Sequence, residues 1–208
     1  MVPFKLALNA STLFPFALDA TQQVRVAAEA GFTGLEVWMK DIEAYLAAGG
    51  TLRSLRGEAR DSGIAIVNAI TFFPWADADA AIQAAGLAQA TREMALLAEL
   101  GCVAVAAPPY GNVADTTLDA IAGAFARLHA AAQQTGIDVY LEFWGRAPRL
   151  SRLSEALYIA VESGVADAKL LLDPFHMYTG GSTLQSIGYL NGANIGIVHV
   201  NDYPAQPM

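Results

Sequence analysis

The chain has 208 residues, of which 54% are hydrophobic and 15% charged, and its formal net charge at pH 7 is −8. This acidic balance, with no cluster of lysine or arginine to offset it, excludes a typical nucleic-acid-binding surface because phosphates would be repelled. The mean hydropathy of +0.36 is high for a soluble protein, but no stretch approaches the roughly 20 apolar residues of a membrane helix, which argues against a membrane protein.

Apolar runs that predict buried strands alternate along the chain with stretches that predict helices. The N-terminus lacks the basic region and long apolar core of a signal peptide. Asp19 and Gln22 have the spacing of a helix capping box, and Gly31 is placed to end that helix. Apolar residues recur at helical spacing in two later stretches, Leu87, Ala90, Met94 and Leu97, then Leu118, Ile121, Phe125 and Leu128. The predicted strands are residues 4–8, 34–38, 65–70, 103–107, 138–143, 169–172 and 196–200.

Glycines recur just before these strands, where a preceding helix should stop, at Gly31, Gly63, Gly101, Gly136 and Gly164. Their recurrence indicates repeated βα units in one domain over residues 1–208, with both faces of a parallel sheet covered. The single cysteine, Cys102, lies in an Ala/Val-rich segment and is expected to be a buried thiol. It fits a reducing compartment, so we expect a cytoplasmic protein.

The number of strands predicts an α/β fold, a (β/α)8 TIM barrel that lacks its last βα units. A closed barrel needs about 250 residues, and seven strands are found here. A doubly wound open sheet is the alternative, although residues 8–12, Leu-Asn-Ala-Ser-Thr, form no Gly-rich phosphate loop after the first strand. Because the first and seventh strands would have unpaired edges, we expect poor solubility or self-association. Self-association across these edges would give a homo-oligomer.

Three polar residues stand at the ends of successive apolar strands: Glu142, Asp173 and His199. They are about 25 to 30 residues apart, the βα repeat distance of a barrel in which strand ends converge on one mouth. Two carboxylates and an imidazole suit one divalent metal ion, Mn²⁺, Mg²⁺, Co²⁺ or Zn²⁺. The structural alternatives are a surface carboxylate, a turn cap and a core histidine, respectively.

Four segments carry a resemblance to a known family: residues 34–38 (Gly-Leu-Glu-Val-Trp), 141–145 (Leu-Glu-Phe-Trp-Gly), 172–176 (Leu-Asp-Pro-Phe-His) and 199–204 (His-Val-Asn-Asp-Tyr-Pro). With them the chain resembles the sugar phosphate isomerase/epimerase group of xylose-isomerase-like TIM barrels, related to endonuclease IV, inosose dehydratase and ketose 3-epimerases. The resemblance implies that Glu142, Asp173 and His199 hold a metal, and that a fourth ligand, a second Glu, lies beyond Met208. It also implies an isomerase or epimerase that acts on a small sugar or related polyhydroxy carbonyl compound through an enediolate. Glu142 would be one member of the acid/base pair.

Four further residues are candidates for substrate binding. The resemblance places His176 where family members contact substrate oxygens. Arg146 could bind an anion or hydroxyl, Trp144 could stack on a sugar, and Glu36 could line the mouth. The alternatives are a structural role for His176, a surface role for Arg146, closure of the barrel top for Trp144 and a hydrogen bond between strand ends for Glu36.

Two departures from the relatives narrow the function. Pro148 stands where ketose 3-epimerases carry a further Glu, and three histidines are too few for the three-metal endonuclease site. An inosose-dehydratase-type lyase, with the same metal, is the alternative enzyme. A truncated, non-catalytic barrel is the alternative from another class.

Overall fold

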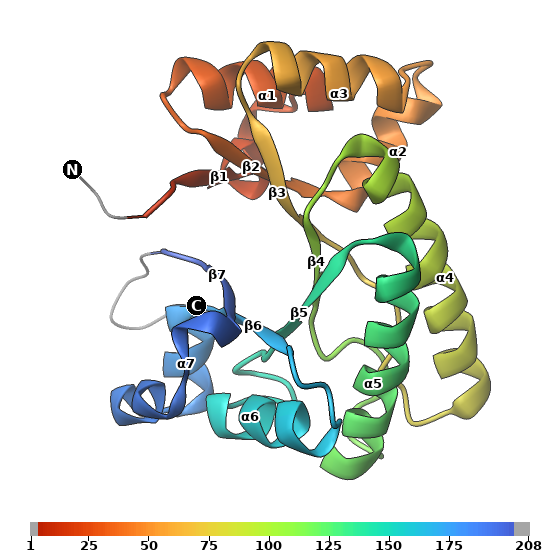
Figure 1. Ribbon diagram of the computed structural model, residues 1–208, viewed down its shortest axis with the longest axis vertical. Helices are drawn as coiled ribbons and strands as arrows, with labels where there is room; N and C mark the ends of the chain where they lie inside the picture. The colour runs from red at the N-terminus through yellow and green to blue at the C-terminus, as the bar shows by residue number, and fades with distance from the viewer. Residues whose placement is uncertain (1–3, 202–208) are drawn as a thin grey trace. The chain divides into compact units, whose positions relative to one another are not determined.

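The computed structural model describes residues 4–201, and within that range it contains one parallel sheet of seven strands. The strands are β1 (Ala7–Asn9), β2 (Gly34–Trp38), β3 (Ala65–Ile70), β4 (Ala104–Ala107), β5 (Asp138–Glu142), β6 (Lys169–Leu172) and β7 (Ile195–Val198). Their order in the sheet is their order in the chain, with helices between them (Figure 1). The predicted bounds of β2, β3 and β6 are confirmed to the residue.

The helices that connect these strands are α1 (Ala20–Glu29), α2 (Met39–Ala47), α3 (Leu52–Asp61), α4 (Ala80–Leu100), α5 (Leu118–Thr135), α6 (Leu153–Glu162) and α7 (Pro174–Gly180). Three short 3-10 helices are η1 (Ala10–Phe16), η2 (Leu184–Tyr189) and η3 (Gly192–Asn194). The predicted capping box of α1 is present: Asp19 Oδ1 accepts the Gln22 backbone N–H at 2.9 Å, and Gln22 Oε1 accepts that of Asp19 at 2.9 Å. The five predicted helix-ending glycines all have positive φ, from +70° to +87°, a conformation that glycine adopts at little cost.

The first and last strands differ from their predicted bounds for local reasons. β1 extends to the polar Asn9 because the parallel register pairs Asn9 with Glu36, and the Asn9 side chain then accepts the Ser11 backbone N–H at 2.9 Å as η1 begins. β7 ends at Val198, but the next backbone N–H, that of His199, still donates to Leu172 O at 2.8 Å. His199 is therefore held beside the end of β6. Residues 202–204 of the last matching segment lie outside the described residues.

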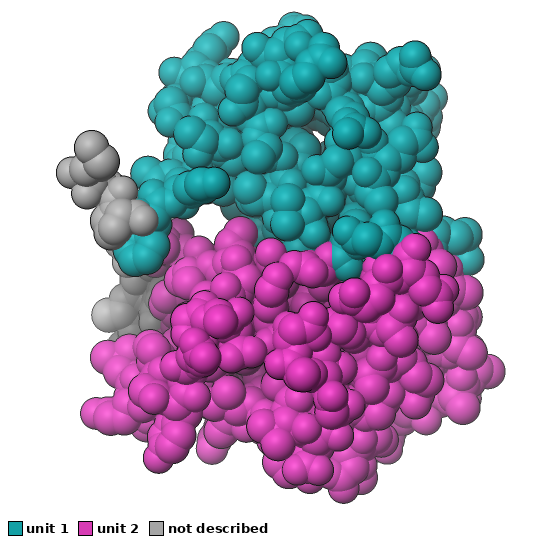
Figure 2. All heavy atoms as spheres, in the orientation of Figure 1, with its two compact units in different colours: residues 1–71, 92–105, 135–137 teal, residues 72–91, 106–134, 138–208 magenta. Residues whose placement is uncertain are grey.

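The chain divides into two compact units, coloured separately in Figure 2. Unit 1 comprises residues 1–71, 92–105 and 135–137, and unit 2 comprises residues 72–91, 106–134 and 138–208. Unit 1 has a core of buried side chains that includes Leu35, Ile42, Leu55, Met94 and Leu97, and the core of unit 2 includes Phe73, Trp75, Phe125, Leu128 and Phe143. The predicted inner faces of α4 and α5 supply Met94, Leu97, Phe125 and Leu128. A single domain over residues 1–208 stays a prediction.

Among residues 4–201, no helix combines the length and apolar character needed to cross a membrane.

Candidate metal centre

Unit 2 places three polar side chains at the carboxyl ends of its parallel strands. Glu142 is the last residue of β5, Asp173 directly follows β6, and His199 directly follows β7. Asp173 is also the N-cap of α7, because its Oδ1 accepts the Phe175 backbone N–H at 2.8 Å. The short helix α7 then carries His176 to the same end of the strands.

These four side chains form one cluster, which we call the carboxylate–histidine cluster. Potential ligand atoms of Glu142, Asp173 and His176 all lie within 4.8 Å of one another. His176 Nε2 is 3.8 Å from Glu142 Oε1, and His199 Nδ1 is 3.3 Å from Asp173 Oδ2. The structure thus brings together the residues that the strand pattern singled out, while their assignment as metal ligands stays a prediction.

Asp173 is ionised although it is buried. Burial alone would raise its pKa, but hydrogen bonds with His199 and Asn201, together with the charges that His176 and His199 carry when protonated at low pH, lower the pKa of Asp173 to about 2. Asn201 Nδ2 donates to Asp173 Oδ1 at 2.9 Å. No role was predicted for Asn201 from the sequence, although it stands within the last matching segment. Its position two residues after His199 was the available signal.

The environment of His176 favours a neutral ring that can donate a hydrogen bond. Burial lowers the pKa of His176, and His199 and Arg146 lower it further against the opposite effect of Asp173, so the ring is neutral at pH 7. The Gly145 backbone N–H donates to His176 Nδ1 at 3.4 Å. Since a neutral imidazole carries one proton, this contact favours the tautomer with the proton on Nε2, which can donate to a substrate oxygen.

Gly145 fixes this contact because it packs directly on α7. A Cβ added to Gly145 would lie 2.5 Å from the His176 carbonyl oxygen, and one added to Gly180 would lie 3.0 Å from Gly145 Cα. Any side chain at either glycine would therefore separate the turn after β5 from α7. The orientation of His176 therefore depends on the close contact between the backbones of Gly145 and Gly180.

The donor set fits a divalent metal ion. Two carboxylates and an imidazole are ligands that several divalent ions accept. The 3.3 Å between His199 Nδ1 and Asp173 Oδ2 is a hydrogen-bond contact, so a metal held by both residues would replace the proton between them. The three residues whose ligand atoms converge within 4.8 Å are Glu142, Asp173 and His176, so His176 is an alternative to His199 as the third ligand. The assignment of Glu142, Asp173 and His199 as ligands stays a prediction.

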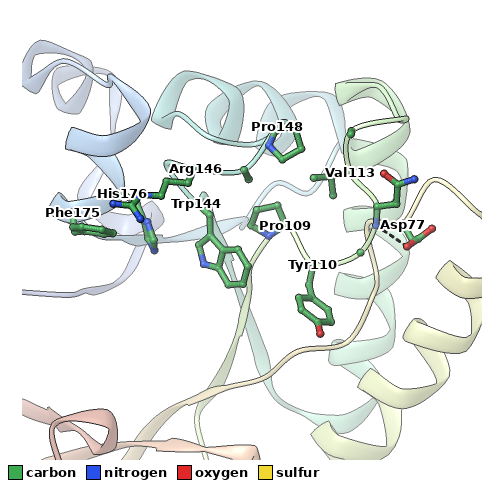
Figure 3. A pocket seen from close by; sticks show the side chains of 13 residues that line it. Asp77, Pro109, Tyr110, Val113, Trp144, Arg146, Pro148, Phe175 and His176 are labelled. Carbon is green, nitrogen blue, oxygen red and sulfur yellow. Dashed lines mark hydrogen bonds between the residues drawn. The ribbon is translucent and has the colours of Figure 1, made fainter. Parts of the chain in front are cut away.

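A cavity of about 720 Å³ adjoins the cluster within unit 2 (Figure 3). His176 belongs to both, and Trp144 and Arg146 also line the cavity. Trp144 is half-buried with its ring centroid 6.4 Å from that of His176. Arg146 is exposed, and its guanidinium lies 5.7 Å from the centroid of the Phe175 ring. Their roles in substrate binding stay predictions.

Glu36 lies in unit 1 and has structural partners there. Its side chain is 2% exposed, Oε1 accepts Asn68 Nδ2 at 2.8 Å, and Oε2 accepts Asn9 Nδ2. These bonds join the polar residues of β1, β2 and β3, which is the structural alternative considered for Glu36. Its role in substrate binding stays a prediction.

The far wall of the cavity, residues 109–114 between β4 and α5, was not predicted from the sequence. This loop contains Tyr110, whose ring centroid is 5.5 Å from that of Phe72. The signal was the run Pro108-Pro109-Tyr110-Gly111 directly after an apolar strand, because loops that follow the strands of a barrel build its sites.

Comparison with known proteins gives both a family and similar structures. Residues 24–208 match the family described as Xylose isomerase-like TIM barrel. A search of curated proteins finds no match. The crystal structure of IOLI protein with a binding zinc atom has a TM-score of 0.88 and 20% identity, over 98% of this chain and 75% of that one.

Two sugar epimerases are also similar in structure. For 3-keto-D-glucoside 4-epimerase from E. coli the TM-score is 0.78 with 21% identity, over 99% of this chain and 83% of that one. For D-psicose 3-epimerase in the presence of D-fructose the TM-score is 0.75 with 20% identity, over 94% and 72%. At these identities the likenesses show the fold alone, and they confirm the parallel α/β fold of a TIM barrel with seven strands in the described residues.

Proposed function

Because the chain belongs to the Xylose isomerase-like TIM barrel family, we propose that it is a metal-dependent isomerase or epimerase of a small sugar or related polyhydroxy carbonyl compound. The observation that carries the proposal is the carboxylate–histidine cluster at the ends of β5, β6 and β7, beside a cavity lined by aromatic and polar side chains. Support comes from the zinc in the similar IOLI structure and from the two similar epimerases.

In this proposal Glu142, Asp173 and His199 hold the metal, and the neutral His176 contacts substrate. A divalent metal, when bound, makes a C–H bond next to a carbonyl more acidic. Asp173 contributes a fixed negative charge, because its pKa of about 2 keeps it ionised at any working pH. His176 donates its Nε2 proton to a substrate oxygen, and Trp144 covers one face of the bound compound.

Glu142 is the group in this cluster that moves the substrate proton. It is buried, with 5% of its surface exposed, and is the residue to which the family resemblance gives an acid/base role. It accepts a proton from one carbon and returns it to the neighbouring carbon, which gives an isomer. An epimer requires that the other member of the acid/base pair deliver a proton to the opposite face. Burial of the carboxylate keeps bulk water from competing for that proton.

Proton exchange with solvent tests this proposal across a range of candidate substrates. The chain is incubated in D₂O with Mn²⁺ and a panel of ketoses and inososes, and loss of the proton signal next to the carbonyl is followed by NMR. We expect exchange that requires the metal, that Glu142→Gln abolishes, and that Glu162→Gln, an exposed carboxylate at the end of α6, leaves unchanged.

Exchange at the same rate without metal, or in Glu142→Gln, would overturn the proposal. A product lighter by one water molecule would instead assign the lyase alternative.

A further inference from the structure

The cavity in unit 2 is larger than a monosaccharide at the cluster requires. It extends from His176 to the loop of residues 109–114 and has a volume of about 720 Å³, in the upper part of the range of about 300–1,000 Å³ for small-molecule sites. Figure 3 shows His176 and Phe175 at one end and Asp77 at the other, with Trp144, Pro109 and Tyr110 between them. A six-carbon sugar held at the cluster would fill the His176 end and leave the far end unoccupied.

Aromatic rings follow the path from the cluster to the far end: His176, Trp144 and Tyr110 line the cavity, and Phe72 contacts the last two rings. The ring centroids of His176 and Trp144 are 6.4 Å apart, those of Trp144 and Phe72 are 6.1 Å apart, and those of Phe72 and Tyr110 are 5.5 Å apart. In Figure 3 the rings of Trp144 and Tyr110 extend from their backbones into the same space. Flat apolar faces of this kind stack on the C–H face of a sugar ring or on another flat group.

Polar groups at the rim favour a sugar ring over a purely apolar group. Tyr110 is 41% exposed, and within residues 4–201 its hydroxyl makes no hydrogen bond. The exposed residues Arg146 and Asn112 also line the cavity, and Asn112 Nδ2 donates to Asp115 Oδ2 at 2.9 Å. Stacking faces next to hydrogen-bonding groups match a sugar ring, whose faces are apolar and whose edge carries hydroxyls.

Hydrogen bonds to a buried carboxylate hold the far wall in place. Both oxygens of the buried Asp77 carboxylate are used to hold it, since Oδ1 accepts the Asp79 backbone N–H at 2.8 Å and Oδ2 accepts that of Asn112 at 2.7 Å. Gly111 has a φ of +111°, and a Cβ added there would lie 2.9 Å from Asp77 Cβ. A preformed wall binds a ligand without the entropic cost of ordering a loop.

We propose that the region lined by Tyr110 and Trp144 binds a second sugar ring, so that the substrate is a glycosylated carbonyl sugar and not a lone monosaccharide. This inference rests on the proposed function, because it takes the carboxylate–histidine cluster as the place where the carbonyl sugar reacts. The second ring stacks on Tyr110 and Trp144, with its hydroxyls toward the Tyr110 hydroxyl and Asn112.

Ketoses with and without a second ring test the proposal. The full chain with Mn²⁺ is titrated with D-fructose and with fructose carrying a glycosyl group at O3, O4 or O6 (turanose, lactulose and isomaltulose). We expect at least one of the three to bind about tenfold more tightly than fructose, and saturation-transfer NMR to show the glycosyl ring in contact with the protein. Equal affinity of all four sugars would overturn the proposal.

Variants of Tyr110 separate stacking from hydrogen bonding. Tyr110→Ala should remove the tenfold gain and leave fructose affinity unchanged, while Tyr110→Phe should keep most of the gain because the ring remains. Tyr158→Ala is the matched control, since Tyr158 on α6 is 40% exposed and lies outside the cavity. A gain that persists in Tyr110→Ala, with an unchanged circular dichroism spectrum, would contradict the assigned subsite.

The outcomes distinguish this inference from the proposed function. Metal-dependent proton exchange on fructose, with no gain from a second ring, overturns the subsite alone. A second-ring gain without proton exchange on any ketose supports the subsite and overturns the proposed chemistry. Phenyl glucoside as an additional probe covers the remaining ligand class: if it binds more tightly than methyl glucoside while the disaccharides gain nothing, the subsite takes a flat apolar group and not a sugar ring.

Discussion

Asp173 caps α7 and carries a negative charge in the cluster, and one substitution separates the two roles. Asparagine caps a helix as well as aspartate does, so Asp173→Asn should keep α7 in place and remove only the charge. We expect the affinity for Mn²⁺ to fall about 100-fold or more, as measured by titration calorimetry. Asp167→Asn, at an exposed carboxylate, is the control and should bind like the unmodified chain; an undiminished affinity in Asp173→Asn would rule out ligation by this residue.

His176→Ala should give the opposite pattern. Because the contact with Gly145 favours a proton on its Nε2, we expect Mn²⁺ affinity within about threefold of the unmodified chain and turnover reduced about 100-fold. Metal content and proton exchange are measured on the same samples. Loss of metal as severe as in Asp173→Asn would mean that His176 is a ligand and that the proton assignment is wrong.

Cys102 gives the stability of the fold a pH dependence of known sign. Burial raises the pKa of its thiol from the ordinary 9.0 to about 12, so the folded chain keeps the thiol protonated while the unfolded chain ionises it. The contribution of Cys102 to stability is therefore complete below pH 9 and is lost as the pH rises toward 12. In urea unfolding, the unmodified chain should lose more stability than Cys102→Ala between these values.

Thiol labelling gives a second measurement of the burial of Cys102. Iodoacetamide at pH 9 should react slowly with the folded chain and rapidly in denaturant, since the thiolate is the reacting species. Equal rates would show that the thiol is not buried.

At the scale of elements, the loop of residues 109–114 depends on Gly111. Gly111→Ala should destabilise the fold by about 1–2 kcal/mol, because Gly111 has a positive φ and lies close to Asp77. The substitution should also weaken binding of the second sugar ring more than binding of fructose. Gly123→Ala is the matched control, because Gly123 lies inside α5 and an added Cβ would meet only Arg127 Nη1, at 3.7 Å. The Gly123→Ala substitution should stabilise the fold by up to about 1 kcal/mol. Equal effects on stability in urea would contradict this account.

The strands and the polar residues at their ends could be predicted because burial leaves a local pattern. Glu142, Asp173 and His199 each end an apolar run that is visible in the sequence alone. The partners of Glu36 could not be predicted in this way, because Asn9 and Asn68 meet it only through the register of three parallel strands. The proton position on His176 depends likewise on Gly145, 31 residues away along the chain.

At the scale of the whole molecule, the two units should unfold together. Both α4 and β4 contribute residues to unit 1 and to unit 2, so loss of either element disrupts both cores. Trp38 lies in unit 1, and Trp75 and Trp144 lie in unit 2. Two variants that share Trp75→Phe, one retaining only Trp38 and the other only Trp144, report on each unit separately.

In each variant we expect the fluorescence transition in urea to coincide with the circular dichroism transition, as a two-state unfolding requires. Two separate transitions would show that the units are independent domains.

The contact between Gly145 and Gly180 limits how this protein can be diversified. Because two backbones set the spacing between the turn after β5 and α7, no choice of side chain can shorten it, and every larger residue lengthens it. A laboratory search for new substrates should therefore recover changes at wall positions such as Tyr110 and Asn112 and almost none at these two glycines. Substrate range and reaction chemistry would then be separately adjustable, which is what makes such a chain a useful starting point for engineering.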